Sequence, residues 1–115
     1  MYDQSQGFNI SVGSINVHSE KEDGLLALTF DPNFSTNDLI YIYYSPGDVN
    51  NVSRVSRFQL NNNTLDNSSE IVMMEWATDR TSNFHYGGDM DFDSLGNLYI
   101  STGDNTTYPL SLIHI

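Results

Sequence analysis

The sequence predicts an all-β protein, and three observations support this fold class. Short segments rich in β-branched and aromatic residues recur along the 115-residue chain, separated by clusters of turn-forming residues about every ten positions. Sustained helical periodicity is missing from the sequence. A Phe-Asp turn followed by a Tyr-Ile strand occurs twice, about sixty residues apart. Such a repeat is typical of β-propeller blades, so we expect about two four-stranded antiparallel blades.

The predicted strands follow from local patterns. Residues 10–17 alternate around Gly13, and residues 25–30 form an apolar run closed by Asp31-Pro32. Residues 39–44 are β-branched and aromatic and stop at a Ser-Pro-Gly-Asp turn. The remaining strands are expected at residues 52–60, 71–76, 90–92 and 98–101.

The internal repeat relates two pairs of aromatic residues. Phe30 corresponds to Phe92 and Tyr41 to Tyr99, with a turn four residues longer in the first copy. In each copy a strand ends in Phe-Asp, a turn ends in asparagine and a Tyr-Ile strand follows. A single sandwich-type domain with two similar hairpins remains the alternative to two blades.

Two blades do not close a propeller, because each blade buries its faces against its neighbours and about four are the minimum. We therefore expect the sequence to be part of a longer chain, with residues 1–109 forming a partial propeller. Residues 110–115 break the repeating pattern and are predicted to be a non-native tail.

The composition argues against several classes of function. The formal net charge is −11 with only four Lys and Arg residues, so binding of a nucleic-acid backbone is not expected. The chain lacks cysteine, which rules out disulfides and thiolate metal sites. The sequence shows neither an apolar run of about 18 residues nor a signal peptide, so no membrane span is predicted.

The candidate catalytic residues are one histidine and one aspartate. His85 precedes Gly87 and Gly88, and Asp104 follows the next predicted strand. A β-hairpin between them brings the two side chains together. An imidazole oriented by a carboxylate is the usual arrangement for removing a proton from a substrate hydroxyl. A structural role for His85 in capping a turn remains the alternative.

Other polar residues are predicted to be structural. His18 has no partner pattern and is expected at the surface. Asp89, Asp91 and Asp93 alternate, but the positions where a calcium loop needs glycine and glutamate hold serine and isoleucine. We therefore expect these aspartates on the polar face of a strand.

Several motifs resemble one known family over residues 20–107. They are the runs at residues 22–34 (EDGLLALTFDPNF), 39–45 (LIYIYYS), 54–58 (RVSRF), 85–88 (HYGG) and 101–104 (STGD). Their order and spacing are similar to those of the soluble glucose/sorbosone (aldose sugar) dehydrogenases that use pyrroloquinoline quinone (PQQ).

The resemblance implies a six-bladed β-propeller that oxidises an aldose at the anomeric hydroxyl to a lactone. It makes His85 the base that removes the hydroxyl proton and Asp104 the residue that orients it. Glu22 stands where many members have a glutamine that contacts the quinone. Asp89 stands where many members have an arginine. Calcium is also implied, with ligands expected beyond this sequence.

The implied partner is a small sugar, and the electron acceptor is left open. The family further implies a periplasmic or secreted protein. An acidic Glu22, Asp89 and strongly negative charge leave a second hypothesis, a non-catalytic β-propeller that binds or scaffolds other molecules and has lost the cofactor.

Overall fold

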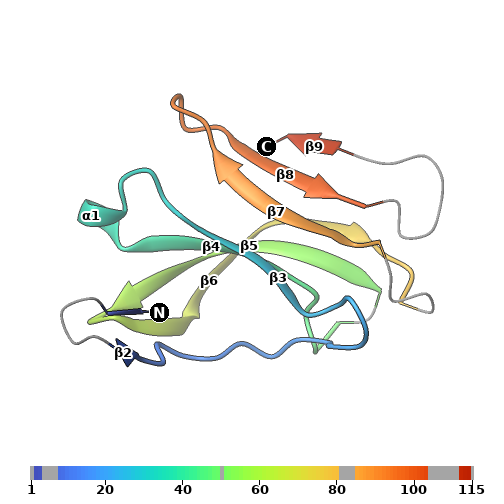
Figure 1. Ribbon diagram of the computed structural model, residues 1–115, viewed down its shortest axis with the longest axis horizontal. Helices are drawn as coiled ribbons and strands as arrows, with labels where there is room; N and C mark the ends of the chain where they lie inside the picture. The colour runs from blue at the N-terminus through green and yellow to red at the C-terminus, as the bar shows by residue number, and fades with distance from the viewer. Residues whose placement is uncertain (1, 4–7, 50, 81–84, 104–111, 115) are drawn as a thin grey trace.

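Antiparallel β-sheets make up nearly all of the computed structural model, which describes residues 2–3, 8–49, 51–80, 85–103 and 112–114 (Figure 1). The all-β class predicted from the sequence is confirmed. The smallest sheet pairs β1 (Tyr2–Asp3) with β2 (Phe8–Asn9). The other two sheets have four and three strands and contain the core.

The four-stranded sheet is a complete blade-like meander. Its strands are β3 (Leu25–Phe30), β4 (Leu39–Tyr44), β5 (Val52–Asn61) and β6 (Thr64–Ala77). Each strand pairs with the next one along the chain, in the order β3-β4-β5-β6. Short turns join antiparallel neighbours, so this topology follows directly from the spacing of the turns.

The second sheet follows in the chain and has the order β7-β8-β9. Its strands are β7 (Gly87–Phe92), β8 (Leu98–Thr102) and β9 (Leu112–His114). Within the described residues this sheet therefore has three strands rather than the expected four. β9 lies in the segment predicted to be a non-native tail, and it pairs with β8 through the register Ile100 opposite Ile113. The separate origin of this tail stays a prediction.

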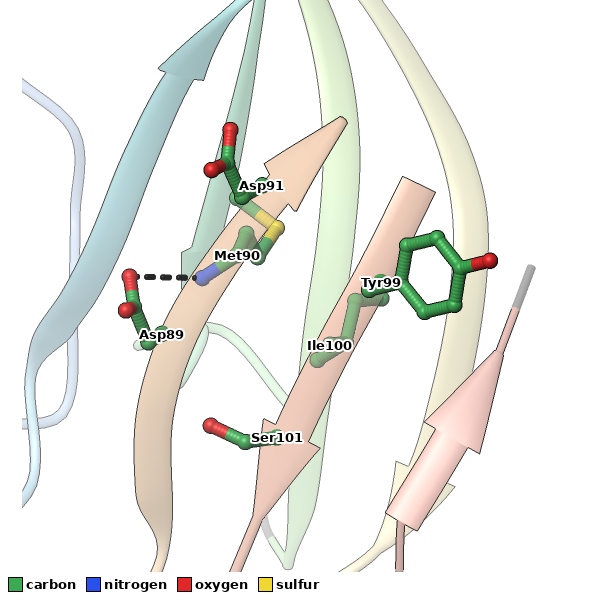
Figure 2. A pocket seen from close by; sticks show the side chains of 6 residues that line it. All are labelled: Asp89, Met90, Asp91, Tyr99, Ile100 and Ser101. Carbon is green, nitrogen blue, oxygen red and sulfur yellow. Dashed lines mark hydrogen bonds between the residues drawn. The ribbon is translucent and has the colours of Figure 1, made fainter. Parts of the chain in front are cut away.

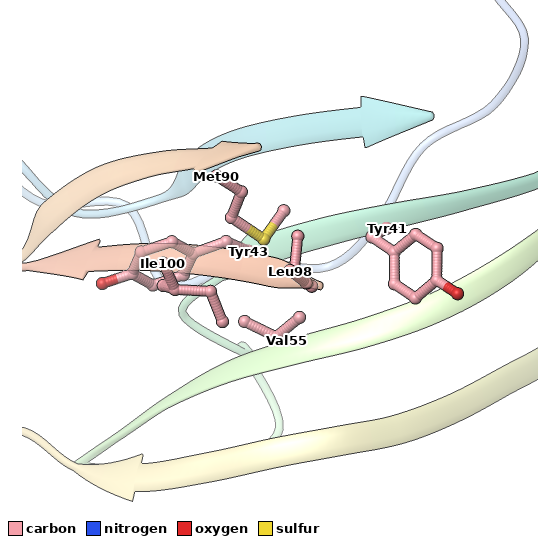
Figure 3. Close-up of a cluster of buried hydrophobic side chains, with 6 residues drawn as sticks. All are labelled: Tyr41, Tyr43, Val55, Met90, Leu98 and Ile100. Carbon is pink, nitrogen blue, oxygen red and sulfur yellow. The ribbon is translucent and has the colours of Figure 1, made fainter. Parts of the chain in front are cut away.

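The two large sheets pack face to face, and β7 lies against β3 (Figure 1). Figure 3 shows the side chains between them. This inter-sheet cluster consists of Tyr41, Tyr43, Val55, Met90, Leu98 and Ile100. Ring contacts extend it, because Tyr41 packs edge-on against Phe92 with centroids 5.1 Å apart. Burial of these faces against each other is the stacking expected of consecutive propeller blades.

A second cluster covers the opposite face of β4. Ile40, Ile42 and Tyr44 point to this side, while Tyr41 and Tyr43 point to the inter-sheet cluster. Alternate side chains of a strand point to opposite faces, so a strand buried on both sides reads as one continuous apolar run. Burial on both faces explains why the sequence of β4 is apolar and aromatic without interruption.

The segment at residues 10–17 differs from its prediction as a strand. Apart from an isolated bridge between Val17 and Pro46, it forms no regular pairing. It runs along the four-stranded sheet, where Ile15 and Val17 pack on the second cluster (Figure 1). Its backbone bonds are scattered, for example from Leu65 N to the carbonyl of Val12 at 2.6 Å. The alternation of apolar and polar residues at positions 10–17 therefore arises because one face of this segment is buried, although no neighbouring strand pairs with it.

One helical turn was also missed. α1 (Phe34–Asn37) lies in the longer copy of the repeated turn and ends at Asp38, whose φ is +55°. Four residues are too few for periodicity to reveal a helix.

The repeated turns share one hydrogen-bond network. In the first copy, Asp31 accepts bonds from the Asn37 side chain at 2.9 Å and the Tyr41 hydroxyl at 3.1 Å. In the second copy, Asp93 accepts bonds from the Asn97 side chain at 3.0 Å and the Tyr99 hydroxyl at 3.2 Å.

Strand register agrees as well, because Tyr41 and Tyr99 each lie opposite the residue before the Phe-Asp phenylalanine. The sequence repeat is thus a structural repeat.

Candidate functional site

His85 lies at the entrance to β7 in an unusual backbone conformation. Its φ is +60°, in the left-handed region that non-glycine residues rarely adopt. The residue is exposed, so its imidazole can meet a ligand. Left-handed non-glycine residues cost free energy and persist only where surrounding contacts hold them, which is frequent at functional sites.

Glu22 provides one such contact. The backbone N–H of His85 donates to Oε2 of Glu22 at 2.8 Å. Glu22 belongs to the turn that precedes β3, so the fold brings together two residues that the sequence had singled out separately. A charged acceptor makes this bond stronger than one between neutral groups.

The backbone around His85 also lies close to the end of β8. A Cβ atom at Gly103 would overlap the carbonyl oxygen of His85. Gly87 has a φ of +94°, and a Cβ atom there would overlap the backbone of Thr102. Only glycine allows this approach. It brings His85 beside Gly103, the residue before Asp104. Asp104 itself lies outside the described residues, so its pairing with the His85 imidazole stays a prediction.

A buried tyrosine supports the residue after His85. The Tyr43 hydroxyl, inside the inter-sheet cluster, donates to the carbonyl oxygen of Tyr86 at 2.8 Å. Burial raises the pKa of Tyr43, and the charge of Asp23 raises it further, so the hydroxyl keeps its proton. From the sequence, Tyr43 is expected only as a strand residue, because alternation along β4 indicates the face on which a side chain lies and not its hydrogen-bond partner.

A buried ionic cluster surrounds Asp23, next to Glu22. The Asp23 carboxylate is fully buried, and His18 Nδ1 lies 2.7 Å from its Oδ2. Arg80 Nε lies 3.6 Å from the same oxygen, and the Ser45 hydroxyl donates to Oδ1. His18 is expected at the surface, and its side chain is 26% exposed, but it has a partner that the sequence pattern did not reveal, because that partner comes from folding of the turn five residues later. Arg80 carried no sequence signal.

Two of the three alternating aspartates lie on the polar face of a strand as predicted, whereas Asp93 lies in the turn after β7. Asp89 and Asp91 are exposed on β7, while Met90 between them is buried in the inter-sheet cluster. They line a shallow hollow of about 180 Å³ on the outer face of the sheet, together with residues of β8 (Figure 2). Each carboxylate accepts the backbone N–H of the next residue, at 2.9 Å in both cases. In a stack of blades this face would meet the next blade, which argues for packing and against a binding site.

Among the described residues, no three His, Asp or Glu side chains gather as they would around a metal ion. Among the same residues, no helix has the length and apolar character needed to cross a bilayer.

Consecutive antiparallel sheets that pack face to face make this chain part of a propeller-type protein. The model of the Glucose / Sorbosone dehydrogenase family matches residues 2–111. The chain belongs to this family. The resemblance noted in its motifs is thereby confirmed.

Solved structures show the same fold. A glucose dehydrogenase superposes with a TM-score of 0.82 at 23% identity, covering 100% of this chain and 37% of its own. A putative oxidoreductase (glucose dehydrogenase) from Thermus thermophilus gives 0.76 at 24% identity, covering 84% of this chain and 29% of its own.

The PQQ-bound form of an aldose sugar dehydrogenase from Streptomyces coelicolor gives a TM-score of 0.77 at 20% identity, covering 90% of this chain and 31% of its own. This chain therefore spans about a third of the length of these relatives. At such identities the likeness establishes the fold. The total of six blades stays an expectation.

Proposed function

We propose that the whole protein is a quinone-dependent dehydrogenase that oxidises an aldose at its anomeric hydroxyl to a lactone, with His85 as the general base. The observation that carries this proposal is the exposed His85 in a strained turn, held by Glu22, inside a chain of the glucose/sorbosone dehydrogenase family. The PQQ-bound relative supports the choice of cofactor.

The proposed role of His85 is proton removal. An unprotonated ring nitrogen takes the proton of the anomeric hydroxyl as the anomeric carbon loses its hydride, and the carbonyl of the lactone forms. When bound, PQQ supplies the two-electron acceptor for that hydride. Asp104 is proposed to accept a hydrogen bond from the other ring nitrogen, which orients the imidazole and stabilises its charged form.

Only some of the residues near the candidate site of this chain suit the binding of an anionic quinone. His85 suits the role of base, since it is exposed beside the glycine-lined backbone at Gly87. Glu22 suits direct contact poorly, because its carboxylate is negative and already accepts the His85 amide. Positive ligands for the cofactor, and the calcium site, are proposed to lie in the rest of the protein. Export to the periplasm or the cell exterior is likewise part of the proposal.

The test uses the full-length protein reconstituted with PQQ and calcium, a dye acceptor and a panel of aldoses. His85→Ala is expected to lower kcat by about 10²- to 10⁴-fold, the usual contribution of a general base. A parallel Leu95→Ala variant, changed at an 85% exposed position in the turn between β7 and β8, controls for a nonspecific effect of substitution. Equal rates of dye reduction by His85→Ala and the unaltered protein would contradict the proposal.

A second candidate is a binding or scaffold propeller without redox chemistry. The acidic Glu22 beside the site and the exposed Asp89 favour it, since both disfavour an anionic cofactor. Equilibrium titration of the full-length protein with PQQ and calcium separates the two. Tight, stoichiometric uptake rules the scaffold out.

A further inference from the structure

The turn that carries Glu22 is anchored by its neighbour. The buried Asp23 carboxylate accepts the backbone N–H of Gly24 at 3.0 Å, in addition to its contacts with His18, Ser45 and Arg80. A buried carboxylate with this many partners has one orientation, because breaking any contact leaves polar atoms without compensation. The backbone of Glu22, one residue earlier, is therefore held in place.

Arg80 completes the anchor from a different part of the chain. Its guanidinium is buried, and it donates to the carbonyls of Pro46 at 2.9 Å, Val49 at 3.0 Å and Val52 at 3.3 Å. Arginine can satisfy several acceptors at once because its donors form a rigid planar fork. The ion pair with Asp23 thus joins the Glu22 turn to the segment between β4 and β5.

Arg80 also precedes His85 by five positions in the sequence. On the far side of His85, the Tyr86 carbonyl is fixed by the Tyr43 hydroxyl. The Tyr86 hydroxyl donates in turn to the Asp79 carbonyl at 3.3 Å. The chain is thus held before and after His85, and Glu22 holds the His85 amide itself.

We propose that Glu22 is a positioning residue for His85, and that the buried Asp23–Arg80 pair holds Glu22 in the orientation this requires. The left-handed backbone of His85 is costly, and the Glu22 carboxylate offsets that cost with a charge-assisted hydrogen bond. The direction of the imidazole depends on this backbone conformation. The inference rests on the proposed function for its catalytic meaning, and its structural part can be tested alone.

The first test measures hydrogen exchange of the His85 amide in the full-length protein without cofactor, by mass spectrometry with residue-level fragmentation. Glu22→Ala is expected to exchange about three- to tenfold faster at His85, as loss of one hydrogen bond implies. Glu22→Gln keeps an acceptor oxygen and is expected to restore protection. Glu75→Ala removes a carboxylate that pairs with Arg54 on β5 and is expected to leave His85 unchanged. Unchanged exchange in Glu22→Ala would overturn the proposal.

The second test concerns the anchor. Asp23→Asn preserves shape but removes the charge, and it is expected to speed exchange at His85 although Glu22 is intact. If this variant does not fold, Arg80→Lys keeps the charge, loses the fork and is expected to give the same local change. Exchange at His85 equal to the unaltered protein in a folded anchor variant would overturn the anchoring role.

Kinetics with the reconstituted protein add a separate readout. Glu22→Ala is expected to lower kcat with little change in KM, and Glu22→Gln to recover most of the rate. Full activity of His85→Ala would refute the proposed function, whereas normal His85 exchange in Glu22→Ala would refute the positioning role. The two failures are therefore distinguishable.

Discussion

Two aspartates that end the repeated strands act as acceptors for a whole turn. The hydrogen bonds from the Asn97 side chain and backbone lower the pKa of Asp93 to about 2. The pKa of Asp31 is also lowered. Burial acts to raise its pKa, but bonds from Asn37, Asn33 and Tyr41 outweigh burial and lower it. In both turns the ionised carboxylate is the form that the fold prefers.

This preference predicts an acid-dependent loss of stability. A depressed folded-state pKa contributes stability that is present above the unfolded pKa of about 4 and is lost as pH falls toward the folded value. Full-length Asp93→Asn is expected to melt below the unaltered protein at pH 7, and the gap in Tm is expected to narrow between about pH 4 and pH 2.

Asp48→Asn is the control for this experiment, because Asp48 is an exposed carboxylate in the turn after β4 and gives the same change in net charge. A Tm difference between Asp93→Asn and the unaltered protein that stays constant down to pH 2 would show that Asp93 ionisation does not matter.

At the scale of elements, β4 is central because both of its faces are buried. One face joins the two sheets through Tyr43 and Tyr41, and the other supports the segment at residues 10–17. The same strand supplies the hydroxyl that fixes Tyr86 beside the candidate base. Packing between the sheets and geometry of the site are therefore coupled through one strand.

Packing between the sheets contributes measurably to the free energy of unfolding. Ile100 on β8 is fully buried in the inter-sheet cluster, so Ile100→Ala is expected to destabilise the full-length protein by about 2–5 kcal/mol. Leu95, 85% exposed in the turn between β7 and β8, is the matched control, and Leu95→Ala is expected to have almost no effect. Chemical denaturation checks both, and equal midpoints would refute the packing argument.

At the scale of the molecule, the chain forms neighbouring sheets, and the edge strands of the four-stranded sheet expose apolar side chains. Large side chains are exposed on two outer strands, namely Leu28 and Phe30 on β3 and Ile71, Val72 and Met73 on β6. A further apolar hollow of about 240 Å³ lies between residues 12–17 and the strands β3 and β4. In a closed propeller such surfaces are covered by other blades.

We predict that the 115-residue chain expressed alone is inactive and self-associates, because these apolar surfaces and strand edges stay accessible to other copies. Sedimentation velocity over a range of concentrations measures this. A monomer at every concentration, with a sharp cooperative melt, would contradict the prediction.

Local patterns were sufficient for much of the fold. Residues 25–30 and 39–44 were predicted with the bounds that β3 and β4 have, since strong alternation or continuous β-propensity ends there at turn residues. β7 begins at Gly87, three residues before its predicted start, because glycine carries no strand signal of its own. At residues 10–17 the same kind of alternation misled, since a segment can bury one face without pairing.

By itself, the sequence determined the all-β class, the blade-like repeat, the family and His85 as the residue of interest. These depend on period, turn chemistry and motif order, which are local properties of the chain. Only the tertiary structure decided that Glu22 accepts the His85 amide, that Asp23 pairs with His18 and Arg80, and that Tyr43 holds Tyr86. These contacts join residues from separate turns and strands, and strand packing selects such partners without leaving a pattern in the sequence.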